Sequence, residues 1–352
     1  MDAVMKASPD VLRQARADDP KARDRDLADK FGVTEADLCA AFTGFGVTRI
    51  AAAPSQLLAD VPRLGEVMAL TRVEACVHER VGTYSTYREG PHAGIVLGDD
   101  IDLRIFPQHW VHAFAVVKES ADGTVRRSLQ VFDAAGDSVH KIHLRAGSDV
   151  AVFDEIVAKL KLEDQSGSIE TKPRPVLEPA RGDAAKAGEL NARWAELTDT
   201  HQFLGLVKEL GMNRLGAYRL ADAQWVRSVG PKAVDAALEA VRDQKIGIMI
   251  FVGNHGCIQI HSGPIENLKP MGPWQNVMDP MFNMHLRADM IKEVYAVTKP
   301  TDRGPAISVE AFDAEGGLIL QMFPIPKEDK DSRPEWNAIV AGIPTAREVE
   351  VA

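Results

Sequence analysis

The sequence has little cysteine: it contains three, and Cys39, Cys76 and Cys257 lie far apart. No CxxC or CxxCH pattern occurs, which argues against a disulfide framework, a cysteine zinc site and covalent attachment of a c-type haem. The simplest location for such a chain is the reducing cytoplasm.

Long apolar runs and excess positive charge are also lacking. No stretch of twenty apolar residues occurs and the N-terminus has no apolar signal region, so we expect neither membrane insertion nor secretion. The formal net charge of −10 argues against nucleic acid as a partner. There is no HExxH zinc motif and no GxGxxG fingerprint between a strand and a helix, so any electrons would come from a donor that the sequence does not identify.

What the sequence does contain is an internal duplication. The segment VHAFAVVKESADGT…SLQVFDAAGDSV is repeated as KEVYAVTKPTDRGP…SVEAFDAEGGLIL, which matches Lys118 with Lys299, Phe132 with Phe312 and Gly136 with Gly316. Upstream, ACVHERVG (75–82) is matched with IMIFVGN (248–254). A repeat of this length indicates duplication of a whole domain, and a cleft between two copies could take one functional residue from each wall.

The order of the expected elements is the same in both halves. Short helices over the first ~70 residues, with Thr34 capping one of them, precede strands from Val73 to Leu144 and a helix near 149–162. Helices return after a linker rich in charge, Pro and Gly, and strands follow from Ile246 to about Phe323. We therefore predict an α+β fold in which each half is a large antiparallel β-sheet with N-terminal helices, with repeats at 1–165 and 188–352 and a linker at 166–187.

One local pattern, LADKFGVTEADLCAAF, has the form of a DNA-binding helix-turn-helix. Its second helix, over 34–43, carries Glu35 and Asp37 but no base-reading side chain. A plain helical hairpin is therefore the better interpretation, and a regulator is a distant third functional hypothesis.

Among ten histidines, His201 stands out. Asp199 is a plausible N-cap with Gln202 as its capping-box partner, which places His201 in the first turn of a helix. Gly205 follows one turn later on the same face, where its missing side chain would let a flat ligand approach. Imidazole beside a bare helical surface is what axial ligation of haem iron requires, although a histidine in a capping turn above a tolerated glycine is the plainer interpretation.

A second constellation is IDLRIFPQHW. Strand alternation puts Ile101, Leu103 and Ile105 on one face, with Asp102, Arg104 and Phe106 on the other. A guanidinium beside an aromatic ring suits a planar anionic ligand, although such a pair on a strand is commonly only surface.

These segments resemble a known family. LTDTHQFLGLVKELGMNR, IMIFVGNHGCIQIHSGPIENLKPMGPW, HAGIVLGDDIDLRIFPQHW and AVTKPTDRG are similar to the cytoplasmic hemin-degrading factor family of bacterial haem-uptake operons (HemS/ChuS/HmuS type). The resemblance spans nearly the whole chain. It implies two similar α+β halves, with haem b in the cleft between the C-terminal helices and the N-terminal sheet.

The resemblance also implies roles for individual residues. His201 matches the proximal iron ligand, Arg104 the distal arginine above the iron, and Phe106 an aromatic beside it. Five more residues match positions around the haem in the family. They are Arg214 as a basic residue, Phe251 as a packing aromatic, Lys299 as a propionate partner, Gln321 as a polar residue of the last strand and Phe323 as a second ring. The family often has Tyr where Phe323 stands and Arg shortly beyond, where this chain has proline, so propionate contacts at that rim are expected to differ.

Two functions are consistent with these residues. In the first, the protein degrades haem, which is then both ligand and substrate, through a site in which His201 and Arg104 are catalytic. In the second, it is a haem chaperone or store that hands haem to a separate oxygenase. The resemblance also implies two kinds of partner, an inner-membrane haem ABC transporter and a downstream haem oxygenase or reductase. One haem per chain is expected, because the segment equivalent to His201 in the first half, placed near Asp37–Phe42, has no histidine.

Overall fold

The computed structural model describes residues 6–120, 122–326, 329 and 331–346 of the chain. Within them, the chain divides into two compact units. The first contains the residues up to Arg72 together with His78–Pro175 and Gly253–Gln259. The second contains Val73–Val77, Val176–Val252 and the residues from Ile260 onward. None of the helices in this described part of the chain is both long and apolar enough to cross a membrane.

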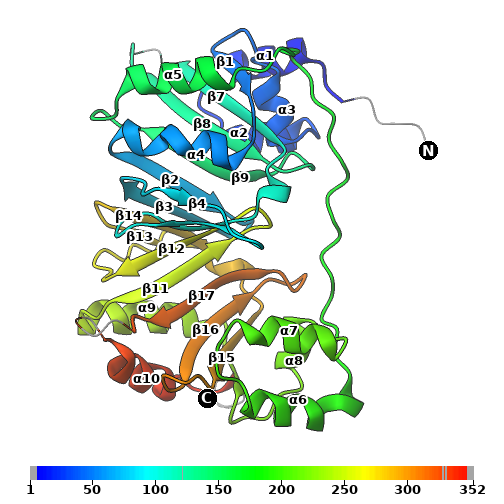
Figure 1. Cartoon of the computed structure of the whole chain (residues 1–352), viewed down its shortest axis with the longest axis vertical. Coiled ribbons are helices and arrows are strands. Elements are labelled where there is room, and N and C mark those ends of the chain that lie inside the picture. Colours follow the sequence, from blue (N-terminus) through cyan, green and yellow to red (C-terminus); the bar gives the residue numbers. More distant parts are fainter. Residues whose placement is uncertain (1–5, 121, 327–328, 330, 347–352) are drawn as a thin grey trace. The chain divides into compact units, whose positions relative to one another are not determined.

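Most elements of the first unit come from the first half of the sequence (Figure 1), although the start of β3 falls in the second unit and the start of β12 in the first. Its helices are α1 (Pro9–Asp18), α2 (Asp24–Lys30), α3 (Glu35–Ala40), α4 (Pro54–Asp60) and α5 (Val150–Leu160), with 3₁₀ turns η1 (Val61–Leu64) and η2 (Pro107–His109). Its strands are β1 (Val47–Ile50), β2 (Val67–Arg72), β3 (Cys76–Gly82), β4 (Tyr87–Arg88), β5 (Gly94–Leu97), β6 (Asp102–Ile105), β7 (His112–Glu119), β8 (Val125–Phe132) and β9 (Ser138–Leu144).

The second unit repeats this plan. Its helices are α6 (Ala187–Ala195), α7 (Gln202–Glu209), α8 (Arg214–Tyr218), α9 (Ala233–Gln244) and α10 (Arg333–Gly342), with 3₁₀ turns η3 (Ala184–Lys186) and η4 (Ala288–Met290). Its strands are β10 (Val226–Val229), β11 (Ile248–Gly253), β12 (Cys257–Gly263), β13 (Trp274–Met278), β14 (Phe282–Arg287), β15 (Glu293–Lys299), β16 (Ala306–Phe312) and β17 (Leu318–Pro324).

The strand order of the sheets is the same in the two units. In the first, β1-β7-β8-β9-β2-β3 lie side by side; in the second, β10-β15-β16-β17-β11-β12 do. Neighbouring strands from β1 to β2 and from β10 to β11 pair antiparallel, as in the pairing of Val116 with Ser128 and of Val297 with Ser308. The predicted duplicated α+β fold with large antiparallel sheets is confirmed.

Alternation along the strands explains why helices cover both faces of each sheet. In β7, Ala113 and Ala115 pack in a cluster with α4 and α5, whereas Phe114 and Val116 pack against α3. Successive side chains of a strand point to opposite faces, so an uninterrupted apolar strand needs cover on both. Near-continuous burial from Ala113 to Val116 reflects that double cover.

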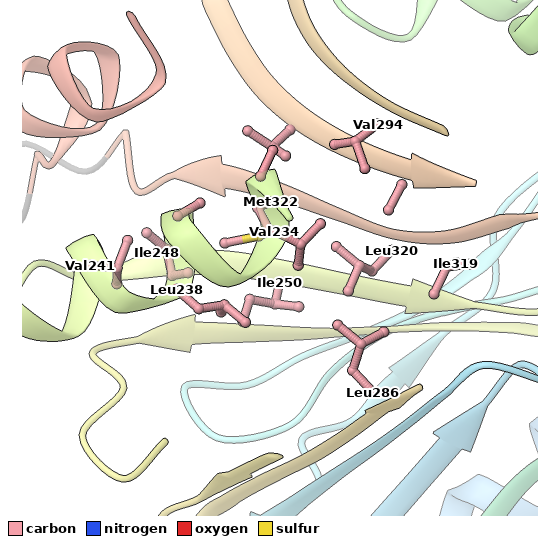
Figure 2. Packing of buried hydrophobic residues seen from close by; sticks show 14 of the residues in the cluster. Val234, Leu238, Val241, Ile248, Ile250, Leu286, Val294, Ile319, Leu320 and Met322 are labelled. Carbon is pink, nitrogen blue, oxygen red and sulfur yellow. The ribbon is translucent and has the colours of Figure 1, made fainter. Parts of the chain in front are cut away.

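The second unit has the same two layers. Val294 and Ala296 of β15 share a core cluster with α9 and α10, while Tyr295 and Val297 share one with α6, α7 and α8. Figure 2 shows side chains of α9, including Val234 and Leu238, packed toward those of β11 and β17. Each sheet is therefore the middle layer of a three-layer unit.

Several predicted boundaries agree with the structure. Thr34 caps α3 through a reciprocal capping box with Asp37, and Asp149 caps α5. The structure also has a turn at Gly98–Asp100 between β5 and β6, and a loop containing Gly136, at φ 83°, between β8 and β9. The chain between Glu163 and Asp183 has no helix or strand, which fits the expected linker; the domain limits at 165/166 and 187/188 stay a prediction.

Two expectations need correction. Strands begin before Val73, since β1 and β2 lie among the helices of the first ~70 residues, and β10 likewise precedes Ile246. Short strands inserted between helices lack the length that makes period-two alternation visible.

The upstream match between the repeats was also displaced by one strand. Because β2 pairs with β9 as β11 pairs with β17, the partner of IMIFVG (248–253) is VMALTR (67–72). ACVHERVG (75–82) then corresponds to GCIQIHSG (256–263), which aligns Cys76 with Cys257 and Gly82 with Gly263.

Candidate functional site

His201 lies at the start of α7 in the second unit. The helix begins at Gln202, so His201 is its N-cap and not a residue of the first turn. The expected cap by Asp199 forms differently: the Asp199 Oδ1 accepts the His201 backbone N–H at 2.7 Å, while Gln202 Oε1 accepts the backbone N–H groups of Thr198 and Asp199. These bonds fix the chain that carries the imidazole.

The imidazole itself is presented to solvent with its orientation set. Its side chain is 93% exposed, and Nδ1 lies 2.6 Å from Asp199 Oδ1. Hydrogen bonds from the backbone and side chain of His201 lower the pKa of Asp199, so the carboxylate is the acceptor and Nδ1–H the donor. Nε2 is left as the free nitrogen that can bind a metal.

The face of α7 beside His201 is bare. Leu204, Gly205 and Lys208 follow at the spacing of one helical face and are exposed. A Cβ placed on Gly205 would meet nothing within 4 Å, and Leu204 is 53% exposed. The predicted open helical surface is therefore present, and it has an apolar side chain in it.

Arg104 and Phe106 belong to the first unit. As predicted, Ile101, Leu103 and Ile105 are fully buried on one side of β6, while Arg104 and Phe106 are half-buried. Arg104 Nη1 donates to the Asp102 carboxylate and, at 3.1 Å, to the Leu103 carbonyl. The guanidinium thus lies beside its own strand with a third of the side chain exposed.

Phe251, Gln321 and Phe323 come together on one face of the second unit's sheet. The rings of Phe251 and Phe323 meet edge to face with centroids 5.3 Å apart. Phe251 pairs across the strands with Gln321, and Gln321 in turn pairs with Glu310. All three side chains are half-buried, so this face combines an aromatic pair with an amide.

Arg214 and Lys299 are joined by a residue that sequence reasoning missed. The fully buried Glu310 accepts from Arg214 Nη1 at 2.9 Å and from Lys299 Nζ at 3.0 Å. The signal available in the sequence was the repeat itself, which has Glu310 where the first half has Gln130.

A family model for the Haemin-degrading HemS.ChuX domain matches this chain twice, over residues 32–160 and 211–343. The chain belongs to the HemS.ChuX family. It is 34% identical over 331 residues to the hemin transport protein HemS of Yersinia enterocolitica, covering 93% of this chain and 94% of that protein.

Solved structures of two relatives of this HemS.ChuX protein have the same fold. Holo-PhuS, a heme-binding protein from Pseudomonas aeruginosa, is 38% identical with a TM-score of 0.91, covering 96% of this chain and 100% of that one. The heme degrading enzyme ChuS of Escherichia coli O157:H7 is 30% identical with a TM-score of 0.86, covering 94% and 97%.

The two HemS.ChuX repeats correct one equivalence drawn from the sequence. Gly32 and Gly211 both have positive φ, and each is followed by a helix capped by Thr34 or Asn213. α2 is therefore the counterpart of α7, and His201 corresponds to Ala22 and not to the segment 37–42. The first repeat still has no histidine at that position.

The helical hairpin formed by α2 and α3 is packed on both sides of its second helix. Leu38 lies in one core cluster, and Ala36 and Ala40 lie in another. Asp37 is buried and paired with Lys6. A helix covered in this way has no face left for the major groove.

Proposed function

We propose that this protein binds haem through Nε2 of His201 and degrades it to release iron. The observation that carries the proposal is the exposed imidazole whose Nδ1 is held by Asp199, beside a helical surface that Gly205 leaves open. A neutral imidazole with its second nitrogen hydrogen-bonded to a carboxylate is a common form of histidine metal ligand.

The remaining predicted residues have roles that follow from their chemistry. Bound haem would supply the redox-active iron and would itself be the substrate. Phe251 and Phe323 offer aromatic packing, and Leu204 offers an aliphatic contact beside the ligand histidine. Arg104 offers guanidinium donors and Phe106 an aromatic ring, and we assign both to contacts with bound haem. The electron donor is a separate molecule.

The second candidate is a haem chaperone that hands its ligand on. Two relatives favour this candidate, because HemS is a hemin transport protein and PhuS a heme-binding protein. A third relative, the heme degrading enzyme ChuS, favours degradation. In either case we place the protein in the cytoplasm, between an inner-membrane haem ABC transporter and, for the chaperone, a downstream haem oxygenase or reductase.

One experiment separates these functions. The protein is loaded with haem without oxygen, and a reductant and O₂ are then added with catalase present. Loss of the Soret band with release of iron supports degradation, whereas an intact band supports the chaperone.

The ligand assignment is tested with His201→Ala. We expect a changed ferric spectrum and weaker binding, because an imidazole–iron bond is lost. A mutant with wild-type spectrum and affinity would show that another histidine, such as His255 or His285, is the ligand.

A further inference from the structure

A buried ion cluster lies beside the aromatic pair of the second unit. Glu310 has no exposed surface, and its carboxylate accepts from Arg214 and Lys299, from the Tyr218 hydroxyl at 2.9 Å and from the Ser308 hydroxyl at 2.9 Å. Burial by itself would raise the pKa of Glu310, but Lys299 and Arg214 lower it to about 2. The cluster thus holds two positive charges against one negative charge.

The two cations of this cluster differ in what they can reach. The Lys299 side chain is 5% exposed, and its ammonium donates to Glu310 and to the Tyr218 hydroxyl at 3.0 Å. The Arg214 side chain is 23% exposed. A guanidinium has five donors, and Arg214 uses Nη1 both for its hydrogen bond to Glu310 and for a weak one to Tyr218 at 3.4 Å. Arg214 is therefore the cation of this cluster that can meet a ligand.

The first repeat provides an internal comparison. At the positions of Lys299 and Gln321 it has Lys118 and Lys141, and at those of Arg214 and Glu310 it has Glu35 and Gln130. Lys118 pairs with Asp24 and Lys141 pairs with Glu35. Each lysine thus has a carboxylate partner, Asp24 also pairs with Arg16, and Glu35 stands where the second repeat has the partly exposed Arg214.

The excess charge in the second unit lies next to an apolar surface. Glu310 pairs across the strands with Gln321, and Gln321 pairs with Phe251, whose ring contacts Phe323. The row therefore runs from two half-buried aromatic rings to a partly exposed guanidinium. Such a row fits a ligand with a flat apolar body and a carboxylate at its edge.

We propose that Glu310 is a positioning residue that holds Arg214 to receive a carboxylate of the bound ligand, and that Lys299 is the buried counter-ion of Glu310 and not itself a ligand contact. The proposal rests on the proposed function, in which the ligand is haem and the carboxylate is a propionate. It replaces the role of propionate partner expected for Lys299 with an indirect one. It also restricts the carboxylate subsite to the second repeat.

The test compares affinities of the full-length protein for haem and for haem dimethyl ester, whose propionates carry no charge. In the wild type we expect haem to bind more tightly. The measured ratio is the affinity for haem divided by the affinity for the dimethyl ester. Arg214→Met should lower this ratio by about tenfold, which is the contribution of one charged hydrogen bond. Glu310→Gln should lower it nearly as far, because Arg214 loses the acceptor that holds it, and Glu310→Asp should restore part of the preference.

The matched control is Gln130→Glu, the reciprocal change in the first repeat, which should leave the ratio at the wild-type value. Simple removal of a negative charge predicts the opposite result, a higher preference for haem in Glu310→Gln. A ratio that is unchanged or raised in this variant overturns the proposal.

The indirect role of Lys299 is tested by a double-mutant cycle. If Lys299 acts only through Glu310, Lys299→Met combined with Glu310→Gln gives the same ratio as Glu310→Gln alone. A further fall in the double variant overturns this role and makes Lys299 a direct contact. Glu310→Gln leaves the buried ammonium of Lys299 without its carboxylate, and the double variant removes that ammonium as well. The double variant can therefore be measured even if Glu310→Gln does not fold. Failure of wild-type protein to bind haem at all is a different result, since it removes the proposed function itself.

Discussion

Asp199 Oδ1 lies 2.6 Å from Nδ1 of His201 and 2.7 Å from the backbone nitrogen of the same residue. One carboxylate oxygen therefore fixes both the main chain and the ring of the proposed iron ligand. Partners of this kind orient a metal-binding histidine and make it more basic.

Asp199→Asn should alter the iron without removing its ligand. Asparagine keeps an oxygen acceptor of the same shape but loses the charge, so the imidazole becomes less electron-rich. We expect about tenfold weaker haem binding and a higher ferric/ferrous midpoint potential, measured by titration and by spectroelectrochemistry. Gln202→Ala is the control for loop shape, because Gln202 holds the backbone of Thr198 and Asp199. Equal shifts in both variants would assign the effect to the loop and not to the carboxylate.

Arg104→Ala should slow haem degradation more than it weakens haem binding. The aromatic packing of Phe106, Phe251 and Phe323 is left in place, so affinity should stay within about tenfold of wild type. Loss of one well-placed donor costs about 3 kcal/mol in a transition state, roughly a hundredfold in the rate of Soret loss. Arg88→Ala is a matched control, since Arg88 is an exposed arginine on β4, two strands from β6. If Arg104→Ala abolishes binding while residual bound haem turns over normally, Arg104 is instead a propionate anchor.

Haem titration should reach a plateau at one equivalent per chain. The first repeat has Ala22 where the second has His201, and Glu35 where the second has Arg214. It therefore lacks both the imidazole and the guanidinium assigned to the ligand. The measurement is the Soret absorbance against added haem, and a plateau at two equivalents would contradict this assignment.

His140 should make the protein sensitive to acid. It is buried in the first unit, where Thr71 and Tyr84 contact its two ring nitrogens at 2.8 and 2.6 Å, and burial lowers its pKa to about 3. Between pH 6.5 and 3 the unfolded chain binds a proton that the folded chain does not. Stability contributed by His140 is therefore complete above pH 6.5 and is lost as pH falls, by about 1.4 kcal/mol per pH unit.

The variant that checks this is His140→Leu, which copies the equivalent Leu320 of the second repeat. We expect about 1–3 kcal/mol lower stability at pH 7, because two buried hydroxyls lose a partner, and a shallower decline toward acid. Urea unfolding at several pH values from 7 to 4.5 measures both, with the exposed His92→Leu as control. An unchanged slope in His140→Leu would mean that other groups, such as His143, dominate.

The sequence by itself determined the repeat, the fold class and the residue types of the site. Matched segments such as SLQVFDAAG and SVEAFDAEG show the duplication directly, and alternation along IDLRIF gave the correct buried and half-buried faces of β6. The cap at Thr34 was readable because a capping side chain bonds to backbone only a few residues away. These features depend on interactions between residues close together in the sequence, so a single sequence is enough to predict them.

Tertiary structure decided which of these residues meet. Arg214, Lys299 and Glu310 come from a helix and two strands, and only the register of β16 with its neighbours brings their charges together in a buried place. The correct alignment of ACVHERVG likewise depended on which strands pair. Charge compensation and strand register are set by long-range contacts, so a single sequence can supply the ions of such a cluster but not their pairing.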